Sequence, residues 1–215
     1  METGGDSRLL NVFQPGLVRG SERLPFDPAK AYAFVEHPTE GWRVYLRTAS
    51  FLHPLTEGTG PDLTNFLVVK RTGARPSTAA WEPPKGQMEG KDFRRNPTAS
   101  ILSVLAENAR REVEEESHVT EITGLRYTGL AFQATERGWP KNWYFQYHIF
   151  QGFLKPEQIE RSFTTFAWIA EHPKAFARWK RDRKEKDAVA WFNPRTTPLN
   201  PRWCPAILVL YLQSK

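Results

Sequence analysis

The feature that most constrains this chain is the acidic run at residues 111–116, which reads Arg-Glu-Val-Glu-Glu-Glu. On a helix Glu112, Glu115 and Glu116 stand at i, i+3 and i+4, so their side chains share one face. Like charges at this spacing repel, and nothing in a solvated helix stabilises them. A hard divalent cation such as Mg²⁺, which takes oxygen ligands, would stabilise them. The run therefore indicates either a salt-bridged surface helix or a helix that holds a metal.

The residues before the acidic run favour one long helix. Thr98 is the predicted N-cap, and Arg111 can pair with Glu115 one turn further on. The apolar residues that follow Thr98 recur at three-to-four spacing, which predicts that one face of the helix is turned to a core. They are Ile101, Leu102, Leu105, Ala109 and Val113.

A second motif lies upstream, where residues 81–86 read Trp-Glu-Pro-Pro-Lys-Gly. The prolines make a rigid approach, and a ligand can come close to the backbone of the final glycine. Together with the acidic run, this segment resembles the signature of the Nudix hydrolases. The family pattern is Gly, five residues, Glu, seven residues, then Arg-Glu-apolar-x-Glu-Glu-x-Gly-apolar. The second half matches through Glu116, and Val119 fits the last apolar place.

The chain departs from the family pattern at three places. The gap from Gly86 to Arg111 is eleven residues longer, the first glutamate position falls on Ser103, and the closing glycine is His118. The insertion, roughly residues 90–100, is polar and predicts a lengthened surface loop, which costs little closure entropy. Glu89 and Glu107 are the two alternatives for the missing glutamate. Because the closing glycine is absent, the sequence does not predict where the helix ends.

The resemblance implies a Mg²⁺-dependent hydrolase, with Mn²⁺ as the alternative metal, that breaks a phosphoanhydride bond in a nucleoside diphosphate linked to another moiety. Clustered metals would screen the anionic pyrophosphate and activate water. Carried over by position, Glu112, Glu115 and Glu116 would be metal ligands, and Gly86 would offer its carbonyl to a metal. Arg111 would orient the glutamates.

Catalytic and substrate-binding roles are also expected for Glu185, Lys85 and Trp139. The predicted catalytic residues are Glu115, Glu116 and Glu185. Glu185 lies in the loop before the final strand, where the family can place its general base, and it is favoured over Asp187 for that role. Residues 181–187 carry mixed charge, however, which is more typical of a solvated surface. Lys85 could meet a phosphate as a point charge, and Trp139 could stack on a base. Alternatively, Lys85 is a lysine that faces solvent, and Trp139 packs against other aromatic residues.

The length of 215 residues predicts an N-terminal polar arm at 1–30 and a single domain at 31–215. The net charge of +6 favours an anionic nucleotide or polyphosphate partner, with RNA as an alternative. The one cysteine, Cys204, permits no internal disulfide and lies in an apolar tail, where it is a poor nucleophile. The chain shows no long apolar run, so we expect no membrane span and no secretion, but a place in the cytoplasm or the nucleus.

The order of elements predicts an α/β fold, a Nudix-like α/β/α sandwich with a mixed sheet. Apolar and aromatic runs predict the strands and a C-terminal helix. Strands are expected at 41–47, 65–71, 125–132, 143–154 and 188–192, a mostly helical segment at 163–184, and a docked helix at 206–212.

Several functions fit these patterns. The leading hypothesis is a pyrophosphohydrolase acting on a dinucleoside polyphosphate, on capped RNA in a decapping reaction, or on another nucleoside diphosphate derivative. The alternatives are an inositol-pyrophosphate phosphohydrolase, a catalytically silent Nudix domain that binds nucleotide or RNA, and an unrelated basic adaptor. Basic clusters do not separate these substrates, because all of them are anionic.

Overall fold

A six-stranded mixed sheet forms the centre of the molecule in the computed structural model, which describes residues 8–56, 62–75 and 77–213. Its strands run in the order β1-β2-β3-β8-β7, and β6 pairs with β3. β3 and β8 are parallel, whereas the other pairs are antiparallel. The strands are β1 (Val18–Leu24), β2 (Asp27–Glu36), β3 (Arg43–Pro54), β6 (Lys85–Gln87), β7 (Thr123–Ala134) and β8 (Trp143–Leu154).

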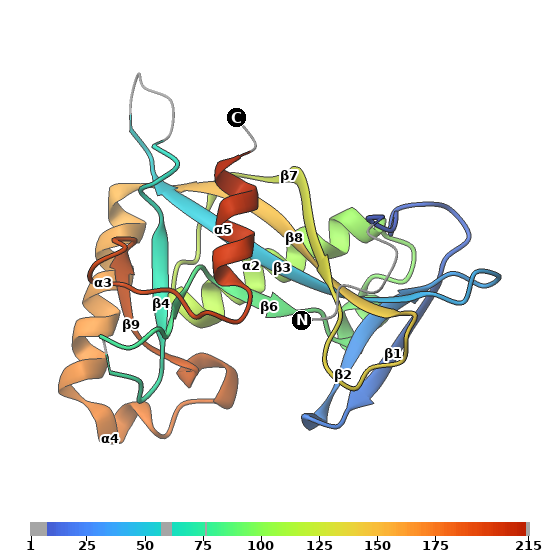
Figure 1. The fold of residues 1–215 in the computed structure, drawn as a ribbon. Coiled ribbons are helices and arrows are strands. Elements are labelled where there is room, and N and C mark those ends of the chain that lie inside the picture. The colour runs from blue at the N-terminus through green and yellow to red at the C-terminus, as the bar shows by residue number, and fades with distance from the viewer. Residues whose placement is uncertain (1–7, 57–61, 76, 214–215) are drawn as a thin grey trace.

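A smaller sheet and the helices complete the fold (Figure 1). The smaller sheet has three antiparallel strands in the order β5 (Trp81–Glu82), β4 (Leu67–Arg71) and β9 (Lys186–Trp191). The helices are α1 (Gly90–Arg95), α2 (Ile101–Ser117), α3 (Pro156–Glu171), α4 (Pro173–Phe176) and α5 (Cys204–Leu212), with a 3₁₀ turn η1 (Arg181–Lys184). Of the helices in the described ranges, none combines the length and apolar character that a membrane crossing requires.

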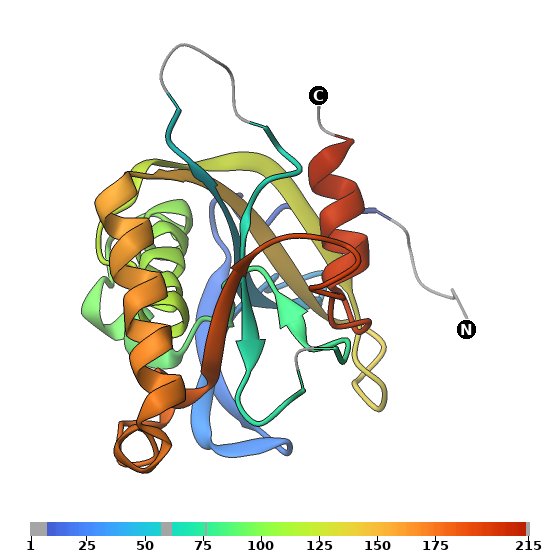
Figure 2. The ribbon, with the colours of Figure 1, turned by 90° about the vertical axis from the view of Figure 1, so that its left-hand side faces the viewer.

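Alternation along β3 explains the layers. Tyr45 and Phe51 belong to a core cluster with Ile207 and Tyr211 of α5. Their neighbours Val44 and Leu46 belong to a cluster with Val104 and Leu105 of α2. Successive side chains of a strand point to opposite faces, so α2 and α5 cover the sheet from opposite sides. Figure 2 shows this sandwich, and the predicted α/β arrangement with a mixed sheet is confirmed.

The N-terminal segment differs from its prediction. Residues 1–7 lie outside the described residues, but the predicted arm at 1–30 is wrong from Val18 onward. There β1 pairs with β2, from Val18 opposite Glu36 to Arg23 opposite Ala31. β1 is an edge strand whose side chains are mostly exposed, so it lacks the apolar alternation that would reveal a strand.

The inserted segment also differs from its prediction. Residues 90–95 form helix α1 rather than a surface loop, and Phe93 is buried in the core beneath α2. Glu89 and Asp92 form a capping box at its start. The N-cap of α2 is Ser100 rather than Thr98, because the Ser100 side chain accepts a hydrogen bond from the Ser103 N–H at 3.1 Å.

Helix α2 has His118 as its C-cap, at the position where the Nudix pattern has a glycine. His118 takes the left-handed conformation, with φ 58°, and its N–H bonds to the Glu114 carbonyl at 3.0 Å. This conformation is uncommon for residues other than glycine, although histidine is among the enriched exceptions. The His118 ring packs against Phe166 and Trp179, with centroids 5.0 and 5.4 Å away. We infer that this packing compensates for the strained backbone.

Candidate active site

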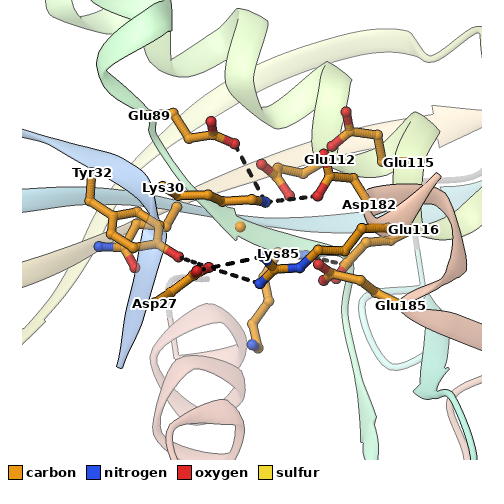
Figure 3. Close-up of a pocket in the computed structure, with 13 residues that line it drawn as sticks. Asp27, Lys30, Tyr32, Lys85, Glu89, Glu112, Glu115, Glu116, Asp182 and Glu185 are labelled. Carbon is orange, nitrogen blue, oxygen red and sulfur yellow. Dashed lines mark hydrogen bonds and ion pairs between the residues drawn. The ribbon is translucent and has the colours of Figure 1, made fainter. Parts of the chain in front are cut away.

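A cavity of about 230 Å³ lies between the acidic face of α2, strand β6 and the turn η1. We call it the acidic cavity, and Figure 3 shows its side chains. Its walls come from the N-terminal hairpin, β6, α2 and the segment before β9. It is lined by Asp27, Lys30, Tyr32, Lys85, Gly86, Gln87, Glu89, Glu112, Glu115, Glu116, Arg181, Asp182 and Glu185. The fold therefore brings six predicted site residues together, namely Lys85, Gly86, Glu112, Glu115, Glu116 and Glu185.

Gly86 is in close contact with α2. A Cβ atom built on Gly86 would lie 1.9 Å from Cδ and 2.0 Å from Oε2 of Glu112. Any side chain here would displace the carboxylate, so only glycine permits this approach. β6 is held in place by pairing with β3, where Gly86 lies opposite Thr48. Thr48 in turn donates to Asn108 of α2 at 2.7 Å, which joins strand and helix.

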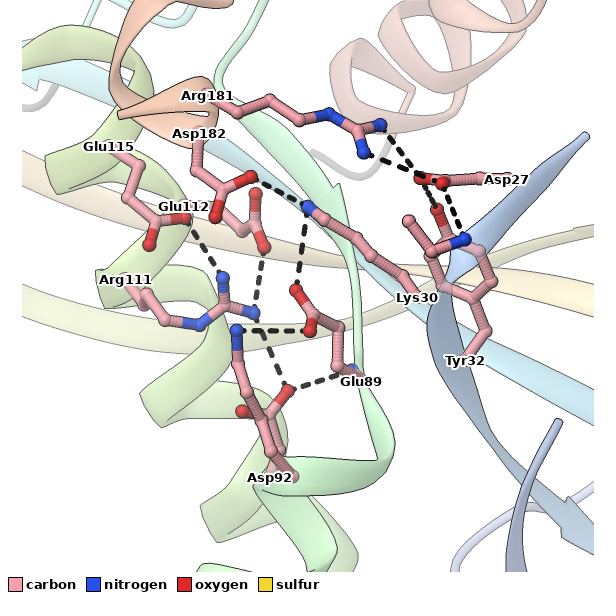
Figure 4. Close-up of polar contacts among 12 residues, drawn as sticks. Asp27, Lys30, Tyr32, Glu89, Asp92, Arg111, Glu112, Glu115, Arg181 and Asp182 are labelled. Carbon is pink, nitrogen blue, oxygen red and sulfur yellow. Dashed lines mark hydrogen bonds and ion pairs between the residues drawn. The ribbon is translucent and has the colours of Figure 1, made fainter. Parts of the chain in front are cut away.

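Arg111 organises the carboxylates, as the resemblance implied (Figure 4). Its guanidinium lies 2.9 Å from Oε1 of Glu112 and 2.9 Å from Oε2 of Glu115. It also lies 3.4 Å from Oδ2 of Asp92 in α1. The planar fork of arginine donors can hold several carboxylates in fixed directions. Through Asp92, the inserted helix therefore supports the acidic face.

Four charged residues form a network at the wall of the cavity, and three of them, Glu82, Glu116 and Lys186, are buried. Lys186 forms ion pairs with Glu82 and, at 2.9 Å, with Oε1 of Glu116. Lys85 pairs with Glu82 at 3.1 Å, and its backbone N–H donates to Oε2 of Glu116 at 2.9 Å. Burial would raise the pKa of Glu82, but Lys85 and Lys186 hold it below its usual value. Burial raises the pKa of Glu116, although Lys186 opposes the rise.

Replacing Lys186 by Met should lower the free energy of unfolding by about 3–5 kcal/mol. The reason is that Glu82 and Glu116 would remain buried without their shared ammonium group. Urea denaturation of the variant and the wild-type protein measures the loss. The exposed Lys180 provides the control, since Lys180→Met should change stability by less than about 0.5 kcal/mol. Equal stability of the two variants would show that the network is not structural.

Several lining residues were not predicted. Lys30 pairs with Asp182 at 2.8 Å and with Glu89 at 3.5 Å, and Arg181 pairs with Asp27 at 2.9 Å (Figures 3 and 4). The pairs of Lys30 with Asp182 and of Arg181 with Asp27 join strand β2 to η1, and the pair of Lys30 with Glu89 joins β2 to the start of α1. The sequence offered a weak signal in the mixed-charge run at 181–187, but none for residues 27–30.

The alternatives left open by the sequence are separated by position. Glu89 lines the acidic cavity, whereas Glu107 accepts a hydrogen bond from Asn96 on the surface. Glu185 lines the cavity, whereas Asp187 is bound to Lys70 and to the Gly73 N–H. The favoured residue of the second pair is thus the one that reaches the site.

Trp139 is the predicted site residue that the structure does not bring to the cavity. It packs against Tyr45, with ring centroids 4.9 Å apart, and against Trp143 and Phe145. Its position supports the alternative of aromatic packing. Cys204 is buried, and burial raises the pKa of its thiol to about 12, so it is not a nucleophile near neutral pH.

The donor set of the acidic cavity fits a hard divalent cation. In the described part of the chain, no three His, Cys, Asp or Glu side chains converge into a ready-made metal centre, so the metal roles stay a prediction. The charges nevertheless favour a cation. Burial raises the pKa of Glu112 to about 8, with Arg111 opposing the rise and Glu116 and Glu115 adding to it. A divalent cation would offset this accumulation of negative charge.

Comparison with known proteins gives structural neighbours only. No family model matches the chain, and no curated protein matches it. A NUDIX hydrolase from Nitrosomonas europaea is 16% identical, with a TM-score of 0.42, covering 80% of this chain and 90% of that chain. A mutT/nudix family protein from Listeria innocua is 19% identical, with a TM-score of 0.42, covering 79% and 92%. A C. elegans Ap4A hydrolase, solved as a binary complex, is 14% identical, with a TM-score of 0.40, covering 79% and 96%.

The names of these three neighbours contain Nudix, mutT or hydrolase. The TM-scores, however, are below 0.5 and the identities below 20%, so the similarity establishes neither the family nor an activity. The residues of the acidic cavity are what indicate a function.

Proposed function

We propose that this protein is a Nudix hydrolase that uses Mg²⁺, or alternatively Mn²⁺, to hydrolyse a phosphoanhydride bond in a nucleotide-linked substrate. One observation carries the proposal. Gly86, Glu112, Glu115 and Glu116, the residues that match the family motif, line one cavity although the motif is interrupted by α1. A cluster of carboxylates beside a glycine strand is what metal-assisted attack on a pyrophosphate requires.

The metal, when bound, would neutralise charge that develops on the phosphate oxygens and would make an attacking water easier to deprotonate. Glu112 and Glu115 would hold it, since Arg111 fixes both carboxylates at the cavity wall. Glu116 would contribute more weakly, because its two oxygens already accept hydrogen bonds from Lys186 and from the Lys85 N–H. Lys30 and Arg181 also line the cavity, where they would attract an anionic substrate.

Glu185 is the residue that we assign to accept the proton of the attacking water. It lines the cavity, where Lys30 and Arg181 act on its carboxylate electrostatically, but within the described ranges neither they nor any other group forms a hydrogen bond or ion pair with it. The other lining carboxylates are engaged by Arg111, Lys30, Lys186 or Arg181. A carboxylate without such a partner is the best placed to take a proton.

A hydrolysis screen tests the proposed function. Dinucleoside tetraphosphate, capped RNA, modified nucleoside triphosphates and inositol pyrophosphate are each incubated with the protein and Mg²⁺, and products are identified by mass. We expect at least one substrate to be split at a phosphoanhydride bond, and EDTA to abolish the reaction. A reaction that is insensitive to EDTA would contradict the proposal.

A silent nucleotide-binding domain is the second candidate. The observation that favours it is the ion pair of Lys186 with Glu116, which engages a predicted metal ligand. Such a domain would bind members of the same panel in a calorimeter while releasing no product over hours.

A further inference from the structure

A second cavity, of about 310 Å³, lies next to the acidic cavity and shares residues 85–87 with it. We call it the basic cavity. Four cationic side chains, Arg47, Arg71, Lys85 and Arg202, line it together with a single carboxylate, Glu136. The remaining lining residues are Phe26, Gly86, Gln87, Tyr147, Asn200, Trp203 and Cys204. The charge of Lys85 is met by Glu82, but Arg47, Arg71 and Arg202 outnumber Glu136, so the basic cavity is opposite in sign to the acidic cavity.

The strand β6 separates the two cavities. Lys85 contacts both cavities. Its backbone N–H donates to Glu116 in the acidic cavity, and its ammonium lies 6.0 Å from the ring centroid of Tyr147 in the basic cavity. In Figure 3 the Lys85 side chain points away from the carboxylates of α2. A molecule that crosses β6 would therefore meet carboxylates on one side and cations on the other.

Arg47 is buried at the wall of the basic cavity. Its guanidinium lies 4.1 Å from the ring centroid of Phe145 and 3.2 Å from Oε1 of Glu136. The other oxygen of Glu136 accepts from Arg202 at 2.6 Å. Glu136 thus positions two guanidinium groups but balances only one positive charge. Within the described ranges, Nε of Arg47 and Nε1 of Trp203 are buried without a hydrogen-bond partner.

We propose that the basic cavity binds the part of the substrate beyond the broken anhydride, and that this part is anionic, a further phosphate or a short chain of phosphates. This inference rests on the proposed function. Two arginines oriented by one carboxylate suit the bidentate hydrogen bonds that phosphate oxygens accept. A neutral sugar would leave the surplus positive charge of the cavity unpaired. The substrate class is thus a nucleoside or polyol carrying more than a diphosphate.

Binding of inorganic tripolyphosphate in EDTA tests the proposal. Without a divalent metal the acidic cavity repels the probe, so binding reports on the basic cavity. We expect Arg202→Gln, at a side chain 68% exposed, to keep the fold and weaken binding by about tenfold. Arg47→Gln should weaken it at least as much, whereas Arg178→Gln, at an exposed residue that lines neither cavity, should not change it.

Equal affinity of the wild-type, Arg47→Gln and Arg202→Gln proteins would overturn the proposal. The proposal would also be overturned if adenosine displaced the tripolyphosphate and if substitution of Trp203, but of neither arginine, weakened binding. The cavity would then be a site where a base stacks. The binding test does not depend on hydrolysis. Arginine-dependent binding without turnover of the substrate panel would contradict the proposed function but support the anion site. Turnover with arginine-independent binding would support the proposed function but contradict the anion site.

Discussion

Replacing Glu115 by Gln should slow hydrolysis by about 10²- to 10³-fold at saturating Mg²⁺. Glutamine keeps the size of the side chain but removes the charge that would hold a cation beside the substrate phosphates. Glu115 lies at the cavity wall, 2.9 Å from the guanidinium of Arg111. The measurement is the initial rate on the substrate that the screen identifies. Thermal unfolding in EDTA should remain close to that of the wild-type protein, because Glu115 is not part of a core.

Glu114 provides a matched control for this substitution. It is the neighbouring residue of the same helix, but it pairs with Arg183 on the surface and does not line the acidic cavity. Glu114→Gln removes the same charge from the same helix and should leave the rate within about twofold. If both variants lose activity equally, the effect is due to helix charge rather than to the cavity. If neither loses activity, the metal mechanism is wrong.

Gly86→Ala should lower activity by about a hundredfold while the protein stays folded. The added Cβ would lie 1.9 Å from Cδ of Glu112, so one of the two must move. The Glu112 carboxylate is the end of a flexible side chain, whereas β6 is held by its pairing with β3. We therefore expect the carboxylate to be displaced, at a cost of no more than about 1 kcal/mol in the free energy of unfolding.

A double-mutant cycle identifies the route of this effect. If Gly86 acts by leaving room for Glu112, then Gly86→Ala should add little to the loss caused by Glu112→Gln, and the two effects should not be additive. Full additivity would mean that the methyl group disturbs another part of the cavity. Wild-type activity in the Gly86→Ala protein would show that the position of Glu112 does not matter.

The elements predicted well are those with a strong local pattern. Strand β8 begins and ends at the predicted Trp143 and Leu154, because aromatic and apolar residues make up most of it. The core helix α2 follows from its apolar spacing, which correctly predicts that Leu105, Ala109 and Val113 are buried but is wrong for Leu102, which is exposed. Strand β1 was missed because an edge strand with exposed side chains carries no such pattern. Helix α1 was missed because it is short and has a capping box and one buried apolar side chain, Phe93, in place of a repeating apolar pattern.

The site divides in the same way. Glu112, Glu115 and Glu116 follow from their spacing on one helix, and Gly86 from the motif that precedes it. Lys30 was beyond prediction, because its partner Asp182 lies 152 residues further along the chain. Trp139 was misplaced because an aromatic residue in a loop has the same appearance whether it stacks on a ligand or on Tyr45. In both cases the position of the side chain is decided by a contact with a segment distant in the sequence.

Titration of Mn²⁺ into the protein in a calorimeter tests the central claim most directly, because it requires no knowledge of the substrate. We predict saturable binding to the wild-type protein and to Glu114→Gln, and loss of that binding in the double variant Glu112→Gln, Glu115→Gln. The same binding in all three proteins, or none in the wild type, would contradict the account of the acidic cavity as a metal site.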